Sequence, residues 1–219
     1  MWCVPSLDDE YIACMMDVLE VYERPYDPAR PVVCFDEKSK QLLDRKRKGS
    51  PVRRGKPQRT DYEYVRHGTV NLFVAVEPKG KTRTLTVTRR RTGKDVALML
   101  ERLVQKTYRD VEAVVLVSDN LNVHSVRTIQ KHLPAERAKA LLDRIEWHFT
   151  PKHASWLNMA EIEIGAISSQ LLGRDIPSFQ EMQKHVAAWT RRRNEDKASI
   201  NWNFTRKKAT EKFKLSAEN

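Results

Sequence analysis

Two apolar stretches of the chain each run directly into an acidic residue, and this pattern limits the folds open to it. Residues 31–35 lead into Asp36, and the stretch from Val111 to Ser118 leads into Asp119. An unbroken apolar run without alternation is typical of a strand covered on both faces of a sheet. The pattern predicts two central strands with a carboxylate at the end of each, which is where open α/β sheets bind ligands.

The remaining periodicity indicates a mixed α/β layer. Two strand-like stretches, 71–77 and 82–88, flank residues 78–81 (Pro-Lys-Gly-Lys), which are typical of a hairpin turn. A fifth strand is expected from Ile145 to Phe149. Helical spacing predicts helices at about 95–104, 125–142 with a break near Pro134, 158–172 and 178–194. This order of elements predicts an α/β fold with a mixed five-stranded sheet flanked by helices.

The segments outside the sheet differ in character. Residues 1–30 predict a linker or docking helix with Ser6 as its N-cap and Pro25 after its last turn. One domain is expected over residues 31–195, interrupted by a basic insert at 38–60. Residues 196–219 form a polar, basic tail, so we expect no further domain there.

The positive charge is concentrated in the insert. The chain has a net charge of +11, yet the segment from Lys38 to Arg59 carries ten basic residues and one acidic residue, so only +2 remains elsewhere. Such a balance favours a polyanionic partner, most often nucleic acid or an anionic membrane surface. With two Gly and two Pro, the insert predicts a loop that contacts DNA phosphates without reading sequence; the alternative is a solvated flexible loop. The cations expected to bind DNA are Arg45, Lys46, Arg47, Lys48, Arg53, Arg54, Lys56 and Arg59.

Other basic runs and the cysteines carry less information. The runs 191–193 and 206–208 are expected to be ordinary solvated faces. Three cysteines at no metal-binding spacing predict reduced thiols in an intracellular protein. The N-terminus lacks the pattern of a signal peptide, and no apolar run reaches the length of a membrane span. We therefore expect a cytoplasmic, nucleoid-associated protein without a membrane partner.

A third acidic position follows the fifth strand. Asn158 and Glu161 have the spacing of a capping box at the start of a helix. Glu161 and Glu163 flank the apolar stripe of that helix on opposite sides. Periodicity alone therefore leaves open which acid, if either, faces the ends of the two central strands.

Several blocks of the chain match a known family in order and over nearly the whole length. The blocks are 24–28, 31–37, 40–42, 61–64, 68–69, 71–73, 119–122 with His124, and 150–163 (Thr-Pro-Lys-His-Ala-Ser-Trp-Leu-Asn-Met-Ala-Glu-Ile-Glu). The chain thus resembles the catalytic domain of bacterial IS630-type insertion-sequence transposases of the Tc1/mariner superfamily. The last two blocks are specific, whereas the strand block alone is weak.

The resemblance implies an RNase H-like fold and a catalytic triad of Asp36, Asp119 and Glu161. These three acids would also be the metal ligands for two Mg²⁺ ions, with Mn²⁺ as a substitute, and Asp36 would bridge both. Two ions about 3.5–4 Å apart can activate water and neutralise the leaving oxygen in phosphodiester cleavage. The implied activity is DNA cleavage at transposon ends and joining to target DNA. The interval between Asp119 and Glu161 is somewhat long for the superfamily, and residues 134–143 are the expected extra length.

Weaker candidates surround these acids. Asn120, His124, His153 and Asn158 are expected to contact substrate or to orient the carboxylates, although turn, cap or loop roles explain each equally well. Glu37 should point to the opposite face of its strand from Asp36. Trp156 is expected to be a packing anchor.

One departure from the family leaves two hypotheses. Family members normally carry helix-turn-helix modules before the catalytic domain, but residues 1–30 show no such pattern with its glycine turn. We expect a frameshifted or truncated product that binds double-stranded DNA weakly and acts with an upstream helix-turn-helix polypeptide or by self-association. The first hypothesis is an active nuclease and strand transferase. The second is a catalytically idle fragment that serves as a DNA-binding or oligomerisation module.

Overall fold

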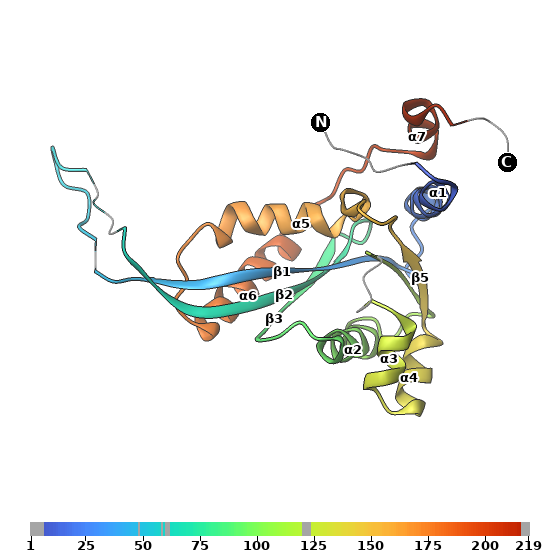
Figure 1. Cartoon of the computed structure of the whole chain (residues 1–219), viewed down its shortest axis with the longest axis horizontal. Coiled ribbons are helices and arrows are strands. Elements are labelled where there is room, and N and C mark those ends of the chain that lie inside the picture. The colour runs from blue at the N-terminus through green and yellow to red at the C-terminus, as the bar shows by residue number, and fades with distance from the viewer. Residues whose placement is uncertain (1–6, 48, 58, 60–61, 120–123, 216–219) are drawn as a thin grey trace.

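Five strands form one mixed sheet with the order β3-β2-β1-β4-β5 (Figure 1). The computed structural model describes residues 7–47, 49–57, 59, 62–119 and 124–215. The strands are β1 Val32–Arg45, β2 Tyr64–Glu77, β3 Thr82–Thr88, β4 Val114–Ser118 and β5 Ile145–Phe149. Strand β2 is antiparallel to β1 and β3, whereas β4 is parallel to β1 and β5. The predicted mixed five-stranded sheet is confirmed.

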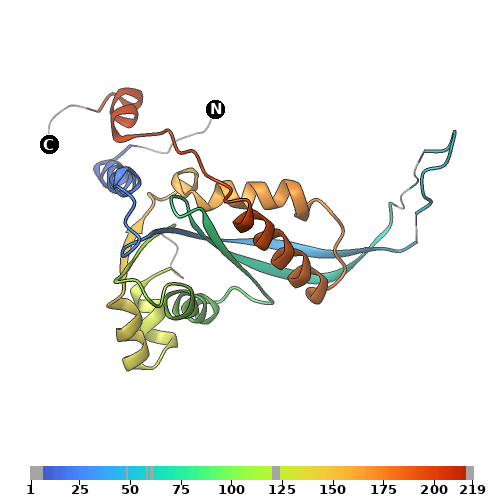
Figure 2. The same ribbon diagram turned by 180° about the vertical axis from the view of Figure 1, so that it is seen from behind.

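Helices cover both faces of the sheet, as Figures 1 and 2 show from opposite sides. The helices in the described part of the chain are α1 Asp9–Glu23, α2 Gly93–Arg102, α3 Val126–His132, α4 Ala135–Leu142, α5 Ala160–Ile167, α6 Phe179–Glu195 and α7 Arg206–Phe213. A helical turn, Ser155–Leu157, precedes α5, and wider π-helical turns extend α2 and α5. The break predicted near Pro134 separates α3 from α4, and α4 fills the expected extra length.

Successive residues of β1 point to opposite faces of the sheet, so alternate residues belong to different core clusters. Val33 and Phe35 belong to a cluster with residues of α2, α3 and α4. Cys34 belongs to a second cluster that contains α1 and the start of α5. A third cluster joins β2 and β3 to α5 and α6 on that same face. Asp36 therefore lies on the face covered by α1 and α5, and Glu37 lies on the face covered by α2 and α3.

The basic insert is not simply a loop, and the prediction was wrong for its first part. Strand β1 continues to Arg45 and stays paired with β2 as far as Tyr64, with a register shift between Gln41 and Leu43. Its mostly polar sequence did not predict a strand. Pairing to β2, burial of Leu42 and a hydrogen bond from the N–H of Leu43 to the carbonyl of Ile176 at 3.0 Å hold it in place. The described residues between 46 and 63 extend from the hairpin away from the body (Figures 1 and 2) and are named the arm below.

Both ends of the described chain pack on the sheet domain. Helix α1 begins at Asp9 with Asp8 as its N-cap, so the prediction of Ser6 as the cap was wrong; Ser6 itself lies outside the described residues. The polar tail contains α7, which sequence periodicity did not predict. Its Ala209 is buried against α1 together with aromatic residues of the preceding segment, including Trp202.

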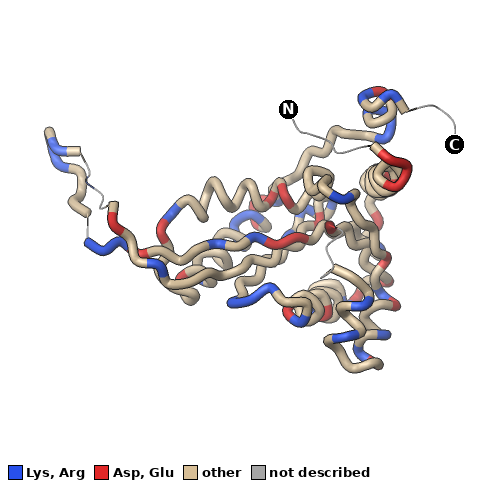
Figure 3. The backbone as a smooth tube through the Cα atoms, in the orientation of Figure 1, with Lys and Arg blue, Asp and Glu red and all other residues tan. Residues whose placement is uncertain are grey.

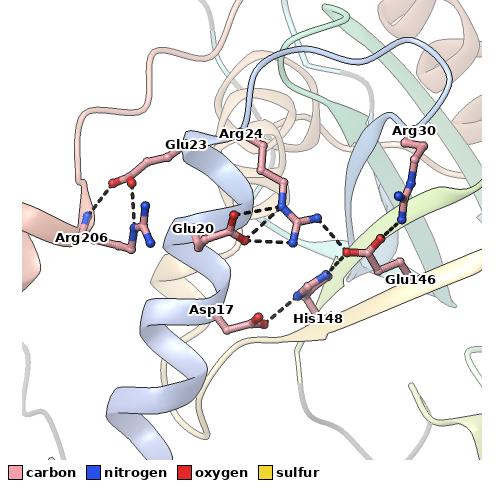
Figure 4. Close-up of polar contacts among 8 residues, drawn as sticks. All are labelled: Asp17, Glu20, Glu23, Arg24, Arg30, Glu146, His148 and Arg206. Carbon is pink, nitrogen blue, oxygen red and sulfur yellow. Dashed lines mark hydrogen bonds and ion pairs between the residues drawn. The ribbon is translucent and has the colours of Figure 1, made fainter. Parts of the chain in front are cut away.

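A network of charged groups ties α1 to the edge strand β5 and to α7 (Figure 4). Arg24 of α1's C-terminus pairs with Glu20 at 2.9 Å and with Glu146 of β5 at 2.7 Å. Its hydrogen bond is the main reason why the pKa of Glu146 falls to about 2. His148 Nδ1 lies 2.7 Å from Asp17. No helix in the described ranges is long and apolar enough to cross a membrane.

Candidate active site

Asp36 and Asp119 lie at equivalent places on two neighbouring parallel strands. Cys34 of β1 pairs with Val117 of β4. Asp36 lies two residues after Cys34, and Asp119 lies two residues after Val117. Asp36 still belongs to β1, whereas Asp119 directly follows the end of β4. The sheet therefore brings the two predicted aspartates to one edge, as the strand-end pattern indicated.

Asp36 is buried among other acidic groups. Asp36 is only 7 % exposed. Burial raises the pKa of Asp36 to about 7, and the charges of Glu161, Asp119 and Glu37 add to this rise. The backbone N–H of Glu37, which donates to Asp36 Oδ1 at 2.7 Å, opposes it. Asp119 and Glu161 thus both lie close enough for their charges to act on the buried Asp36.

Glu161 lies in the first turn of α5 and is exposed. The alternative of a capping box is not realised, because Asn158 Oδ1 accepts from the N–H of Ala160 at 3.1 Å. The N–H of Glu161 is bonded instead to the backbone carbonyl of Asn158 at 3.0 Å. No other described residue forms a hydrogen bond or ion pair with the Glu161 carboxylate, so it is available for a ligand.

Glu163, two residues further on, has the opposite environment. It is fully buried and lies 3.1 Å from Arg83 Nε. Arg193 binds the same carboxylate through two hydrogen bonds of 3.0 and 3.1 Å. Glu163 therefore holds α5 to β3 and α6, whereas Glu161 is exposed and its charge acts on Asp36.

Two of the weaker candidates contact the aspartates directly. Asn158 is fully buried, and its Nδ2 donates to the carbonyl of Phe35 at 2.9 Å and to Asp36 Oδ2 at 3.3 Å. His124 is buried as well, and its Nδ1 contacts the Asp119 carboxylate. These contacts fix the directions in which both aspartates point.

His124 also links Asp119 to Glu37 on the other face of β1. Its Nε2 lies 3.0 Å from Glu37 Oε2. Burial alone lowers the pKa of His124, but the contacts with Asp119 and Glu37 outweigh burial and raise it to about 10. The imidazolium ring thus bridges two carboxylates, and Glu37, on the opposite face of its strand from Asp36 as predicted, contacts the site through His124.

A cavity of about 300 Å³ opens beside Asp119. It is lined by Asp119 and by residues 150–155 of the segment that joins β5 to α5. His153 in this segment is exposed and has a left-handed backbone conformation, with φ of 63°. The buried hydroxyl of Thr150 has no hydrogen-bond partner among the described residues. His153 borders the cavity beside Asp119, and Asn120 lies outside the described residues.

Sequence reasoning missed two features of the site. Arg89, Arg90 and Arg91 follow β3 and are exposed, and Arg91 Nη1 lies 3.9 Å from Glu37 Oε1. Three consecutive cations directly after a strand were a signal that sequence could have supplied. Tyr22 of α1 contacts Leu157, next to Asn158, across 135 positions of sequence. No local sequence pattern predicts a contact between residues that far apart in the chain.

The site offers oxygen ligands but no complete cage. Among the residues that the structure describes, no three His, Cys, Asp or Glu side chains are grouped closely enough to hold one ion. Mg²⁺ does not need such a cage, because it keeps several waters and is commonly bound by one or two carboxylates with the phosphates of a substrate. The three acids therefore fit an ion that arrives with its water or with DNA.

The sheet order and the acidic edge define an RNase H-like domain. The sequence profile described as DDE superfamily endonuclease matches residues 31–183, and the chain belongs to this family. No curated protein sequence matches it. The predicted DDE family and the predicted fold class are confirmed, whereas the IS630-type assignment stays a prediction.

Solved structures of the Mos1 mariner transposase share the fold. The paired-end complex with Mn matches with a TM-score of 0.57 at 19 % identity, over 90 % of this chain and 60 % of that one. The strand transfer complex matches with a TM-score of 0.58 at 19 % identity, over 87 % and 57 %. The isolated catalytic domain matches with a TM-score of 0.53 at 14 % identity, over 92 % of this chain and 100 % of that one. The chain thus spans about 60 % of the length of the Mos1 chain in the Mn complex.

Proposed function

We propose that this chain is the catalytic part of a transposase, which cleaves DNA at transposon ends and joins them to target DNA in a divalent-metal-dependent reaction. The observation that carries the proposal is that Asp36 and Asp119 lie at one edge of the sheet, with the charge of Glu161 acting on Asp36, in a domain of the DDE endonuclease family. The Mos1 structures with the same fold include a paired-end complex and a strand transfer complex, which supports the two steps proposed here.

The three carboxylates suit hard divalent cations. Their mutual repulsion and the burial of Asp36 leave negative charge that a cation would stabilise. Mg²⁺ prefers oxygen ligands of this kind, and Mos1 complexes with Mn and with Mg have been solved. We propose that Asp36 is shared between two ions, while Asp119 and Glu161 each complete one site. When bound, such ions stabilise charge on the attacking and leaving oxygens of phosphodiester cleavage.

The neighbouring side chains hold this arrangement in place. Asn158 donates to Asp36, and His124 contacts Asp119, so neither aspartate has to be ordered when DNA binds. The cavity beside Asp119 offers space for the nucleotide next to the scissile phosphate. Cleavage by water and joining through a DNA 3′-hydroxyl would use the same carboxylates, since both reactions attack a phosphodiester.

The DNA surface extends from the site to the arm. In Figure 3 basic residues mark much of the arm, far from the acidic edge. The exposed cations proposed to contact phosphates in the arm are Arg53, Arg54, Lys56 and Arg59. Lys46 and Arg47 lie 3.0 and 3.6 Å from Glu63, and Arg45 lies 2.5 Å from Asp175, so these three are partly neutralised. Lys48 lies outside the described residues.

The arginines after β3 complete that surface. Arg89 lies over the ring of Phe179 at 4.4 Å from its centroid, which orders the run against α6. Arg91 reaches Glu37, one residue from Asp36. We propose that Arg89–Arg91 hold the DNA backbone beside the site, whereas the arm binds it at a distance. The expected self-association and helix-turn-helix partner stay predictions.

A cleavage assay tests the proposal. Duplex DNA that carries the ends of the element is incubated with protein and Mg²⁺ or Mn²⁺, with EDTA as the metal-free arm. We expect cleavage only with metal, and a loss of at least about 100-fold for Asp119→Ala, since even outer partners of a metal site contribute 10–100-fold. Asp110→Ala is the matched control, because Asp110 is exposed and lies before the same strand. DNA binding without cleavage by the wild type would instead support the idle module.

A further inference from the structure

Tyr22 of α1 is joined to the turn that precedes α5. It is 6 % exposed, and its hydroxyl donates to the carbonyl of Leu157 at 2.8 Å. The same hydroxyl accepts from the N–H of Met159 at 3.4 Å and lies 3.4 Å from Cys34 Sγ. One side chain of the N-terminal helix therefore satisfies two backbone groups on either side of Asn158.

The start of α5 depends on these contacts because it lacks an ordinary cap. The N-cap position, Met159, provides no side-chain hydrogen bond. The first N–H groups of a helix need partners outside the helix. Asn158 supplies one of them by accepting from Ala160, and Tyr22 fixes the backbone before and after Asn158.

A continuous series of contacts thus runs from α1 to Asp36 and to the turn that carries Glu161. Tyr22 holds the turn 157–159, Asn158 in that turn donates to Asp36, and Glu161 follows in the first turn of α5. A small shift of this turn would move the Glu161 carboxylate and release the hydrogen bond to Asp36 at the same time.

Helix α1 is itself well anchored, which makes Tyr22 a firm support. On its outer side it is tied to β5 through Asp17 and Arg24, and to α7 through Glu23 (Figure 4). The ring of Tyr22 packs edge-on against Trp202, with centroids 5.3 Å apart. The ring therefore contributes packing, whereas the hydroxyl contributes the contacts with the turn.

We propose that Tyr22 is a positioning residue, whose hydroxyl sets the distance between Glu161 and Asp36 and thereby the affinity of the site for divalent cations. The inference rests on the proposed function, because it needs the two acids to be metal ligands. Partners outside the ligand set commonly change metal affinity by 10–100-fold, since they fix the direction of the ligands.

Tyr22→Phe tests the proposal, because it removes the hydroxyl and keeps the ring. Binding of Mn²⁺ and Mg²⁺ is measured by calorimetry on the full chain, and thermal unfolding is measured with EDTA. Tyr108→Phe is the matched control: Tyr108 is also buried, and its hydroxyl donates to Glu77 at 3.1 Å, away from the acids. We expect Tyr22→Phe to weaken metal binding by about 10–100-fold, and Tyr108→Phe to leave it within twofold. DNA binding in EDTA should stay unchanged in both.

Asn158→Ala provides a second variant along the same series of contacts. If Tyr22 acts through the turn, the double variant should lose little more affinity than Asn158→Ala alone, because coupled residues are not additive. Independent losses that multiply would overturn the proposal, as would wild-type metal affinity in Tyr22→Phe or an equal loss in Tyr108→Phe. If wild type binds no divalent cation either alone or with duplex DNA present, the proposed function fails together with the inference. If wild type and Tyr22→Phe bind metal equally and both cleave DNA, only the inference fails.

Discussion

The two halves of the β1–β2 hairpin differ sharply in environment and in charge. In the inner half the strands are covered on both faces, and burial with neighbouring acids raises the pKa of Asp36 to about 7. In the outer half the same strands leave the body and lead to a basic, exposed arm. A carboxylate that binds metal gains from a poorly solvated position, whereas phosphate-binding cations must remain accessible to DNA. The contrast shows how one hairpin can serve both needs.

The largest effects are expected at Glu161 and Glu163, on DNA cleavage for the first and on unfolding free energy for the second. Glu161→Gln is expected to lower cleavage by at least about 100-fold, as for a metal ligand, and to leave the unfolding temperature unchanged. Glu163→Gln leaves Arg83 buried without its full partner, and breaking a buried ion pair costs about 3–5 kcal/mol of unfolding free energy. Glu163 is thus unsuitable as a neutral control. Calorimetric unfolding and single-turnover cleavage, measured together, check both results, and reversed phenotypes would contradict the assignment.

The pH dependence of the metal-free protein tests the buried half next. The folded pKa of Asp36, about 7, lies above its unfolded value, so the folded state binds the extra proton between about pH 4 and 7. Stability from this group is present below that window and is lost as the pH rises through it. Asp36→Asn should therefore reduce the fall in unfolding temperature between pH 5 and 8 in EDTA. An unchanged slope would mean that Asp36 is solvated.

Saturating Mn²⁺ should restore stability to the wild type at pH 8. A cation that binds only the folded state stabilises it by about 2.7 kcal/mol at a hundredfold excess over its dissociation constant. Asp36→Asn should show little of this gain. An equal rise in unfolding temperature for both proteins would place the ion elsewhere.

Neutralising the arm should have a smaller effect, confined to DNA binding. Arg53→Gln, Arg54→Gln and Lys56→Gln together are expected to lower the slope of log affinity against log salt by about 0.9 per lost phosphate contact. Arg191→Gln with Arg192→Gln, on the exposed surface of α6, is the control. Fluorescence anisotropy over a salt series gives both slopes. Equal slopes for the arm variant and wild type would show that the arm only extends into solvent.

A single arginine beside the site gives the smallest predicted change. Arg90 is exposed between Arg89 and Arg91, so Arg90→Gln should not alter unfolding. We expect it to lower the same salt slope by about 0.9, corresponding to one phosphate. If the slope is unchanged while the arm variant lowers it, DNA does not pass along the end of β3.

The local sequence pattern predicted the two central strands and the edge of the sheet at which they end. The apolar runs before Asp36 and Asp119 determined two strands and the edge at which they meet. Tertiary contacts decided the rest. Glu161 and Glu163 are equivalent by periodicity, and only Arg83 and Arg193, both distant in sequence, separate them. The outer half of β1 is mostly polar, with Leu42 as its one buried apolar residue, so sequence did not predict the strand that pairing to β2 shows.

The polar contacts of the site were likewise not predictable from the sequence. Glu37 points away from Asp36, as the strand alternation predicted, yet it reaches Asp119 through His124. That link needs β1 and the segment before α3 to be adjacent, which no spacing along the chain indicates. The same holds for Tyr22 and the turn before α5.

Anomalous diffraction from crystals soaked in Mn²⁺, with short duplex DNA bound, tests the central claim most directly. We expect two manganese peaks, one between Asp36 and Asp119 and one between Asp36 and Glu161, and a loss of the second in Glu161→Gln. Peaks at other residues, or no peak beside Asp36 at saturating Mn²⁺, would contradict it.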